Sequence, residues 1–433
     1  MPEFLKLTPP EEALHILLSN LQIRKPETEI LDTRLSLGRV TGEDIVAGHP
    51  LPEFPRSTVD GYAVRAQDTY GSSESMPGYL TLVGEILMGT SASVKIALGT
   101  CALIHTGGML PGGADSVVML EDTQTVQSRK MQNYKVNEIE ITHAVAAGEN
   151  ILQVGEDVMT GNVVIKCGSM IRPAEVGGCM ALGIVQLRVA IKPKVGIIST
   201  GDEIIDPEEQ TSAGQVRDIN SFTLAALIES AGGEPVLYGI LKDDLDLLTS
   251  VARKAINECD AVVITAGSSA SSRDTTVDAI RRLGKPEVLV HGINIRPGKP
   301  TILSVCKGKA VIGLPGNPVS ALVVASVILV PLIKSYLGLT SIRVQSTVLA
   351  KLMINIASQA GREDWIAVKL IPNSKKLPSD IQKKSEEEFS YFAEPIFGKS
   401  NLIFSLVAAD GLIRIPMERT GISAGEIVEV IPM

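Results

Sequence analysis

The chain has 433 residues, 45% of them hydrophobic, which suits about two to four folded domains. The net charge of −9 disfavours nucleic acid and an anionic membrane surface as main partners, and aromatic residues, at 3%, are too few for base-stacking platforms. Five scattered cysteines without Cys-x-x-Cys spacing fit a cytoplasmic protein, and we expect no leader peptide and no membrane-spanning run.

The first predicted element is a helix near the N-terminus. Thr8 and Glu11 have the spacing of a capping box, and two prolines precede an apolar run. A second helix is predicted over Pro173–Leu182, although two glycines weaken it. Because these helices flank short apolar runs broken by glycines, we expect a β-rich domain inserted into a mixed N-terminal domain.

Two loops of the β-rich region carry polar residues beside glycines. In the first loop, Asp60-Gly61 is a dipeptide typical of a hairpin turn. The second loop, residues 104–115, holds Gly107, Gly108, Gly112 and Gly113 between apolar strands. Such glycines let the backbone approach a ligand closely.

After Lys192 apolar strands alternate with helices. Strands are predicted over residues 195–199, 235–240 and 261–265, with helices starting at Asn220 as an N-cap, at Leu245 and after Asp274. This order predicts a doubly wound, mostly parallel sheet. Ligands of such sheets bind at the carboxyl ends of the strands.

Acidic residues follow the strands at this edge: Asp202, Glu203, Asp243, Asp244 and Asp274. Each carboxylate alone is explained by a helix cap or a solvated turn. Together they suit Mg²⁺, which binds a few carboxylates plus phosphate and water oxygens.

Two Gly/Pro turns bracket the last strand of this region. The first turn carries Arg296 and Lys299, and the second ends in Asn317 as N-cap and Pro318 as first helical residue, which leaves free backbone N–H groups. For either turn alone, a purely structural role explains the sequence as well as a binding role does. Side by side, and with donors from the Gly/Ser run 267–272, they predict a pocket for phosphate or a tetrahedral oxyanion.

The C-terminal part is predicted to be a small β-barrel, with strands such as Ser346–Leu352 and Trp365–Leu370 and a solvated hairpin loop over 373–388. No Walker A loop, dinucleotide fingerprint, His-Glu-x-x-His or Gly-x-Ser-x-Gly elbow is present. The residue pattern by itself therefore predicts a metal-assisted site that binds a phosphorylated or oxyanionic small molecule. The predicted parts are residues 1–50 with 150–190, 51–149, 191–338 and 339–433.

Five motifs in the same order resemble the molybdopterin molybdotransferase family, which includes MoeA and the gephyrin E domain. They are Pro55-Arg-Ser-Thr-Val-Asp-Gly-Tyr-Ala63, Ile104-His-Thr-Gly-Gly108 with Pro111-Gly-Gly-Ala-Asp115, Ser199-Thr-Gly-Asp-Glu203, Arg296-Pro-Gly-Lys-Pro300 and Gly313-Leu-Pro-Gly-Asn-Pro-Val-Ser320. The resemblance spans essentially the whole chain. It implies an α/β multidomain fold: a mixed N-terminal domain, the inserted β-rich domain, a MogA-like doubly wound domain and a C-terminal β-barrel.

The resemblance also implies an activity. Family members insert molybdate into adenylylated molybdopterin, with Mg²⁺-dependent cleavage of the adenylate and release of AMP and molybdenum cofactor. The implied catalytic residues are Asp60, Thr106, Glu203, Asp243 and Asp274, of which the last three would bind the metal. The implied substrate- and molybdate-binding residues are Ser269, Arg296, Lys299, Pro300, Asn317, Arg362 and Ser400.

Family members are homodimers that share active sites between chains, so Asp60 and Thr106 are expected to act across the interface. An upstream molybdopterin adenylyltransferase and molybdoenzyme apoproteins or chaperones are further expected partners. The chain departs from the family motifs at Arg296, where lysine is usual, at Gly292, and in the glycine-poor run 267–272. Two alternatives stay open: a tungstate-inserting homologue and a non-catalytic scaffold of the same fold.

Overall fold

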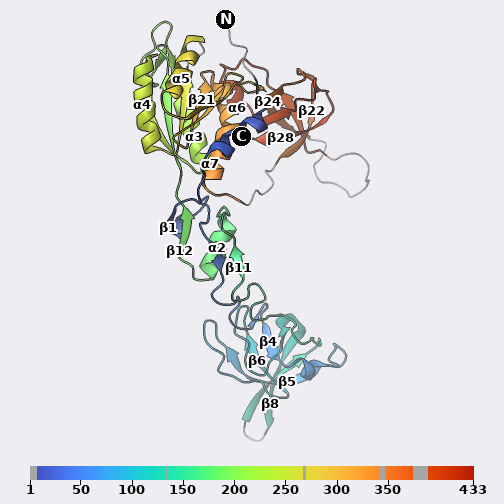
Figure 1. Cartoon of the computed structure of the whole chain (residues 1–433). Coiled ribbons are helices and arrows are strands. Elements are labelled where there is room, and N and C mark those ends of the chain that lie inside the picture. The colour runs from blue at the N-terminus through green and yellow to red at the C-terminus, as the bar shows by residue number, and fades with distance from the viewer. Residues whose placement is uncertain (1–6, 132–133, 267–269, 341–346, 374–388) are drawn as a thin grey trace. The chain divides into compact units, whose positions relative to one another are not determined.

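The computed structural model describes residues 7–131, 134–266, 270–340, 347–373 and 389–433 (Figure 1). The chain divides into two compact units. The larger unit comprises residues 1–42, 168–172 and 186–433, and the smaller unit comprises residues 43–167 and 173–185.

The smaller unit is built on a six-stranded sheet with apolar residues on both faces. Along one strand Tyr62 and Val64 pack into one hydrophobic cluster, and Ala63 between them packs into the other. The prediction of a β-rich inserted domain is confirmed. In sheet order the strands are β7 (Ser116–Met119), β4 (Gly61–Val64), β6 (Thr100–Ile104), β5 (Gly78–Ile86), β9 (Tyr134–Ile141) and β8 (Thr123–Met131).

The Asp60-Gly61 dipeptide does not form a hairpin turn. Gly61 is the first residue of β4 and pairs with Met119 of β7. A Cβ added at Gly61 would lie 2.0 Å from the Val118 carbonyl oxygen. The glycine is therefore explained by close contact between two strands.

Short strands and one helix precede and follow the inserted sheet along the chain. In the larger unit β1 (Thr28–Asp32) pairs antiparallel with β12 (Gln186–Ala190), so the chain leaves for the insertion and returns from it side by side. The smaller unit adds β2 (Ile45–Val46) with β11 (Val163–Ile165), β3 (Arg56–Ser57) with β10 (Ile151–Leu152), and the predicted helix α2 (Pro173–Ala181). The predicted domain boundaries remain predictions.

The opening helix α1 (Pro10–Asn20) exists, but its predicted capping box does not form. The N-cap residue is Pro9, and no side chain caps the helix. The Ala13 amide instead donates to the Pro9 carbonyl.

The larger unit contains the predicted doubly wound sheet. Neighbouring pairs among β16, β13, β17 and β21 are parallel, and β20 and β18 continue the sheet through antiparallel pairs. Residues of α1, α3 (Asn220–Ser230) and α6 (Pro318–Val324) pack on one face. Residues of α4 (Leu245–Glu258) and α5 (Ala270–Arg281) pack on the other. In sheet order the strands are β16 (Glu234–Leu241), β13 (Lys194–Thr200), β17 (Ala261–Ala266), β21 (Lys309–Pro315), β20 (Ile302–Cys306) and β18 (Pro286–His291).

Two predicted helix starts are displaced. In helix α3 (Asn220–Ser230) Asn220 is already helical and the N-cap is Ile219, while Asp218 accepts from the Ser221 amide at 3.1 Å. Helix α5 (Ala270–Arg281) begins before Asp274, so part of the supposed Gly/Ser loop is helical. Helix α4 (Leu245–Glu258) starts as predicted, with Asp244 accepting from the Leu247 amide.

The last helix of the sheet domain is long and apolar. It runs through α6 (Pro318–Val324), a π-helical segment (Ala325–Leu329) and α7 (Val330–Tyr336). By length and composition these 19 residues, with a mean hydropathy of 2.0, could cross a membrane, so the expectation that no run is apolar enough is wrong. Half of the helix is buried within the protein, as is typical of a core helix.

The C-terminal part is the predicted β-barrel. Strand β24 (Glu363–Pro372) pairs with both β25 (Tyr391–Pro395) and β26 (Gly411–Ile415), and β22 (Val348–Leu352) with β28 (Ile427–Pro432) completes the ring. The short strand β19 (Ile295–Arg296) joins the barrel by pairing with β24. The basic turn of the sheet domain is thus fixed to the barrel. The predicted hairpin loop lies almost entirely outside the described residues.

Candidate active site

The basic turn connects β19 to β20 and is folded tightly on itself. The Ile293 amide donates to the Lys299 carbonyl at 3.0 Å, and the Thr301 hydroxyl donates to the Gly298 carbonyl at 2.7 Å. Gly298 has φ +120, and a Cβ there would lie 2.2 Å from Val324 Cγ2. Close packing against α6 therefore holds the turn, while the side chains of Arg296 and Lys299 stay exposed.

A pocket of about 760 Å³ lies between this turn, the start of α6 and the barrel. It brings together six residues that are separated in the sequence. All were predicted to bind substrate or molybdate, including the two assigned from the weakest motif matches: Arg296, Lys299, Pro300, Asn317, Arg362 and Ser400.

The charged residues lining the pocket are all cationic: Arg296, Lys299, Arg362 and Lys399. The two arginines share one buried carboxylate, Asp364, which does not itself line the pocket. Asp364, 0% exposed, accepts from Arg362 Nε at 2.7 Å and from its Nη2 at 3.0 Å, and lies 3.9 Å from Arg296 Nη1. Within the described part of the chain, neither Lys299 nor Lys399 forms an ion pair. The two lysines therefore supply the uncompensated positive charge.

Two pocket residues were missed from the sequence. Lys399 adjoins the predicted Ser400, but only the fold turns it toward the other cations. Trp365 is the only tryptophan in the chain, and its Nε1 donates to Glu363 Oε1 at 2.7 Å. Glu363 is in turn held by Arg414. The indole is thus a fixed aromatic wall, which no local pattern indicates.

The helix start at Asn317 differs in part from the prediction. Asn317 is the N-cap, but its side chain makes no capping hydrogen bond. The Val319 amide, expected to be free, donates to the Ser400 carbonyl at 3.1 Å. Asn220 holds the preceding turn by donating to the Gly316 carbonyl at 2.8 Å. These contacts rigidify the pocket wall but leave fewer free amides for an anion.

The acidic residues lie at the carboxyl edge of the parallel strands. The Asp243 amide donates to Asp202 Oδ1 at 3.4 Å, which joins the ends of β13 and β16. Glu203 folds its carboxylate back over Gly201, where an added Cβ would lie 2.8 Å from Glu203 Oε2. Asp274 lies in the first half of α5, and its side chain and Ser269 lie outside what the structure describes.

Among the described residues, no group of three His, Cys, Asp or Glu side chains is placed to hold a metal ion. Two buried cysteines are also disfavoured as nucleophiles. Burial raises the pKa of Cys101 to about 12 and that of Cys306 to about 11, so both thiols stay protonated at neutral pH.

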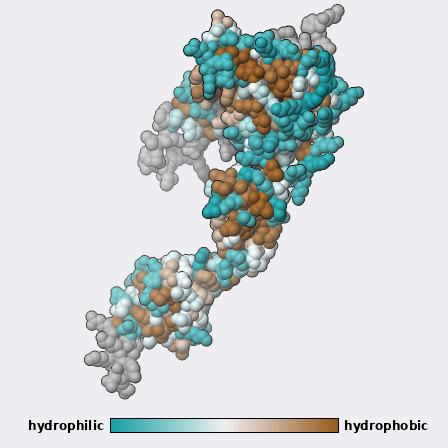
Figure 2. Space-filling model, turned by 90° about the vertical axis from the view of Figure 1, so that its left-hand side faces the viewer, coloured by the Kyte–Doolittle hydropathy of each residue, from teal (hydrophilic) through white to brown (hydrophobic). Residues whose placement is uncertain are grey.

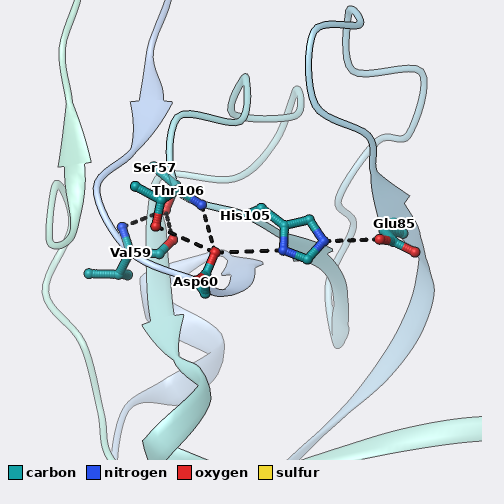
Figure 3. Close-up of polar contacts among 6 residues, drawn as sticks. All are labelled: Ser57, Val59, Asp60, Glu85, His105 and Thr106. Carbon is teal, nitrogen blue, oxygen red and sulfur yellow. Dashed lines mark hydrogen bonds and ion pairs between the residues drawn. The ribbon is translucent and has the colours of Figure 1, made fainter.

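In the smaller unit Asp60 and Thr106 lie together, as Figure 3 shows. The Thr106 amide donates to Asp60 Oδ1 at 2.8 Å, and the Thr106 hydroxyl lies 3.4 Å from the same oxygen. Two of the four glycines beside them are explained by contacts within the chain, whereas a Cβ at Gly112 would meet nothing within 4 Å. A Cβ at Gly108 would meet the His105 carbonyl oxygen at 2.8 Å, and one at Gly113 would meet that of Ile96 at 2.2 Å.

Gly298→Ala is expected to weaken binding of the predicted tetrahedral oxyanion by about tenfold, because overpacking against Val324 shifts the basic turn. Isothermal titration calorimetry measures this affinity. Gly298→Ala with Val324→Ala should regain part of it, whereas Gly308→Ala, at φ +77 with open space around it, should leave it unchanged. Equal affinities for Gly298→Ala and the wild type would show that the turn tolerates the extra methyl.

Three family models match almost the whole chain. The MoeA N-terminal region (domain I and II) matches residues 8–183, the probable molybdopterin binding domain matches 196–335, and the MoeA C-terminal region (domain IV) matches 350–433.

Similar proteins carry related names. A putative molybdopterin biosynthesis protein of Methanocaldococcus jannaschii is 35% identical over 91% of this chain and 89% of its own length. A molybdopterin molybdenumtransferase of Staphylococcus aureus is 28% identical over 92% of this chain and 89% of its own length. Two solved structures of a molybdopterin biosynthesis MoeA protein from Pyrococcus horikoshii each match 99% of this chain. The first has a TM-score of 0.76 at 36% identity and is covered over 99% of its own chain. The second has a TM-score of 0.81 at 32% identity and is covered over 100% of its own chain.

Proposed function

This chain belongs to the MoeA family, and on that premise we propose that it is a molybdopterin molybdenumtransferase in molybdenum cofactor biosynthesis. It inserts molybdate into adenylylated molybdopterin and cleaves the adenylate, which releases AMP and molybdenum cofactor. The observation that carries the proposal is the pocket whose charged lining, among the residues that the structure describes, consists of four cations. Both substrates are anions, so such a pocket favours them electrostatically.

The pocket residues divide the work of binding. Lys299 and Arg296 attract the molybdate dianion, with Pro300, Asn317, Arg362 and Ser400 completing its surroundings. Ser269 lies outside the described residues and stays a predicted ligand. Asp364 fixes the Arg362 guanidinium through two hydrogen bonds, so this cation needs little reordering on binding. Lys399, outside the predicted set, adds charge for a phosphate of the second substrate.

Mg²⁺ is the expected cofactor, and the donor set fits it in kind. Mg²⁺ commonly binds one or two carboxylates and completes its shell with phosphate and water oxygens, so a three-carboxylate cage is not required. Glu203, Asp243 and Asp274 would hold it. When bound, the ion neutralises charge that develops on the phosphates during adenylate cleavage.

Asp60 and Thr106 are proposed to complete the site from the second chain of a homodimer. Exposed hydrophobic residues support self-association. Ile30, Leu35 and Leu37 are 60%, 70% and 62% exposed, and Figure 2 shows hydrophobic side chains gathered at the surface around β1 and β12. Large apolar patches on soluble proteins commonly mark interfaces.

The proposed setting is the cytoplasm, where an upstream molybdopterin adenylyltransferase supplies the adenylylated substrate. Molybdoenzyme apoproteins or their chaperones receive the product. A purely structural scaffold would have no use for uncompensated lysines in a pocket, which favours chemistry over that alternative. Tungstate has the same shape and charge as molybdate, so it is tested as a second substrate.

The proposal predicts that purified protein releases AMP from adenylylated molybdopterin when Mg²⁺ and molybdate are present. Asp274→Ala should reduce the rate at least about 10²-fold if this carboxylate serves the metal. Release is measured by chromatography, with tungstate replacing molybdate in a parallel reaction. AMP at background level, with Asp274→Ala equal to wild type, would refute the enzyme.

The same assay tests the shared site. Asp60→Ala and Glu203→Ala chains are each expected to be inactive, and mixed dimers of the two should regain part of the activity because one of their two sites is intact. Absence of recovery in verified mixed dimers would contradict an active site shared between chains.

A further inference from the structure

A histidine lies directly behind the Asp60 carboxylate and is held from its other side by a glutamate. His105 Nδ1 is 3.6 Å from Asp60 Oδ1, and His105 Nε2 is 3.0 Å from Glu85 Oε1 (Figure 3). Asp60 precedes β4, His105 follows β6 and Glu85 lies on β5. Neighbouring strands of one sheet therefore align the three side chains.

The Asp60 carboxylate is anchored through one oxygen only. Its Oδ1 accepts from the Thr106 amide, lies near the Thr106 hydroxyl and faces the His105 ring. Its Oδ2 has no hydrogen-bond or ion-pair partner among the residues that the structure describes. Three contacts on one oxygen fix the carboxylate plane and leave the other oxygen available to a ligand.

Both ring nitrogens of His105 face carboxylate oxygens, which favours the ring with a proton on each nitrogen. The hydrogen bond to Glu85 is the largest cause that raises the pKa of His105 above its ordinary value, and the charges of Glu85 and Asp60 add to it. The ring is 39% exposed, so solvent screens these interactions and each is worth little alone.

We propose that His105, held by Glu85, is a positioning residue for the Asp60 carboxylate. It acts through Asp60 and touches no substrate, and its effect on catalysis rests on the proposed function. The cation attracts Oδ1 toward its ring while the Thr106 amide holds the same oxygen from another direction, so Oδ2 is presented in one orientation. Neither His105 nor Glu85 belongs to the residues predicted from the sequence.

The sign of the pH dependence follows from the raised pKa. The imidazolium is fully present below the ordinary histidine value and is lost as the pH rises through the raised one. Loss of the charge removes the attraction to both carboxylates, and Asp60 keeps only its contacts to Thr106. The hold on Asp60 is therefore strongest on the acidic side and weakest on the alkaline side.

The test compares full-length His105→Gln and Glu85→Gln with His49→Gln. His49 is a matched control because it is 36% exposed and lies 3.3 Å from Glu53 in the same unit. The first readout is the Thr106 amide resonance in protein labelled with ¹⁵N-threonine, followed from about pH 5.5 to about pH 9. It should titrate with His105 in wild type and His49→Gln, should not titrate in His105→Gln, and should titrate at lower pH in Glu85→Gln.

The second readout is the pH profile of AMP release. His105→Gln should reduce the rate by about two- to fivefold on the acidic side, where the cation acts, and should match wild type on the alkaline side. The proposal would be overturned by a Thr106 amide resonance that titrates identically in wild type and His105→Gln. A rate loss of equal size at every pH would also overturn it. If no protein releases AMP, the proposed function fails, and the Thr106 resonance still decides whether His105 positions Asp60.

Discussion

Lys299→Gln is expected to lower molybdate-dependent AMP release by about 10²-fold, the loss typical of removing one donor to a developing or bound oxyanion. Lys299 lines the pocket and has no ion pair in the described part of the chain. By contrast, Arg296 and Arg362 are partly compensated by Asp364. Glutamine keeps most of the side-chain length but removes the charge, so the loss reports on electrostatics.

The measurement is the dependence of the AMP release rate on molybdate concentration. Lys369→Gln is the matched control, because Lys369 is an exposed lysine on β24 outside the pocket. Lys399→Gln should reduce the rate less than Lys299→Gln, since Lys399 is proposed to meet the second substrate. If the AMP release rate of Lys299→Gln were within about threefold of the rate of Lys369→Gln, Lys299 would not belong to the molybdate site.

Asp364→Ala is expected to lower the free energy of unfolding of the barrel by about 3 kcal/mol, the low end of the range for breaking a buried ion pair. The low end applies because Arg362 is 26% exposed and regains some water when its partner is lost. Asp364 also accepts from the Ser358 hydroxyl at 2.9 Å, so three hydrogen bonds to one buried carboxylate disappear.

Urea unfolding followed by tryptophan fluorescence measures this effect locally, because Trp365 is the only tryptophan and lies on β24. Glu394→Ala, on the exposed side of β25, should change the free energy by less than about 0.5 kcal/mol. Adding Arg362→Leu to Asp364→Ala should restore part of the stability by removing the unpaired charge. No restoration would mean that lost packing, not charge, causes the effect.

The sequence alone predicted the fold class well. Continuous apolar strands between helices indicated the parallel sheet, and the carboxyl ends of these strands predicted the acidic edge. The helix starts were less accurate, because Asn220 is already helical in α3 and it is Asp218, two residues earlier, that accepts from the Ser221 amide. Cap residues two positions apart look alike in sequence, and only backbone geometry separates them.

The family resemblance predicted six residues that the fold gathers in one pocket, including Arg362 and Ser400, whose matches lie outside the five motifs. It could not predict Asp364, whose burial behind two arginines depends on β19 joining β24. It also missed Lys399, Trp365, His105 and Glu85. These residues carry no local signal, because what matters is which distant side chain each one faces.

The sequence by itself therefore determined the order of strands and helices, the positions of the glycine turns and the residue types offered to a ligand, since periodicity and turn chemistry are local properties. Only the tertiary structure decided which charges are compensated and which remain available. Arg362 is partly compensated by the buried Asp364 carboxylate, whereas Lys299 is not. That difference depends on burial and on distances between side chains from separate elements, and it makes Lys299 the strongest candidate for holding molybdate.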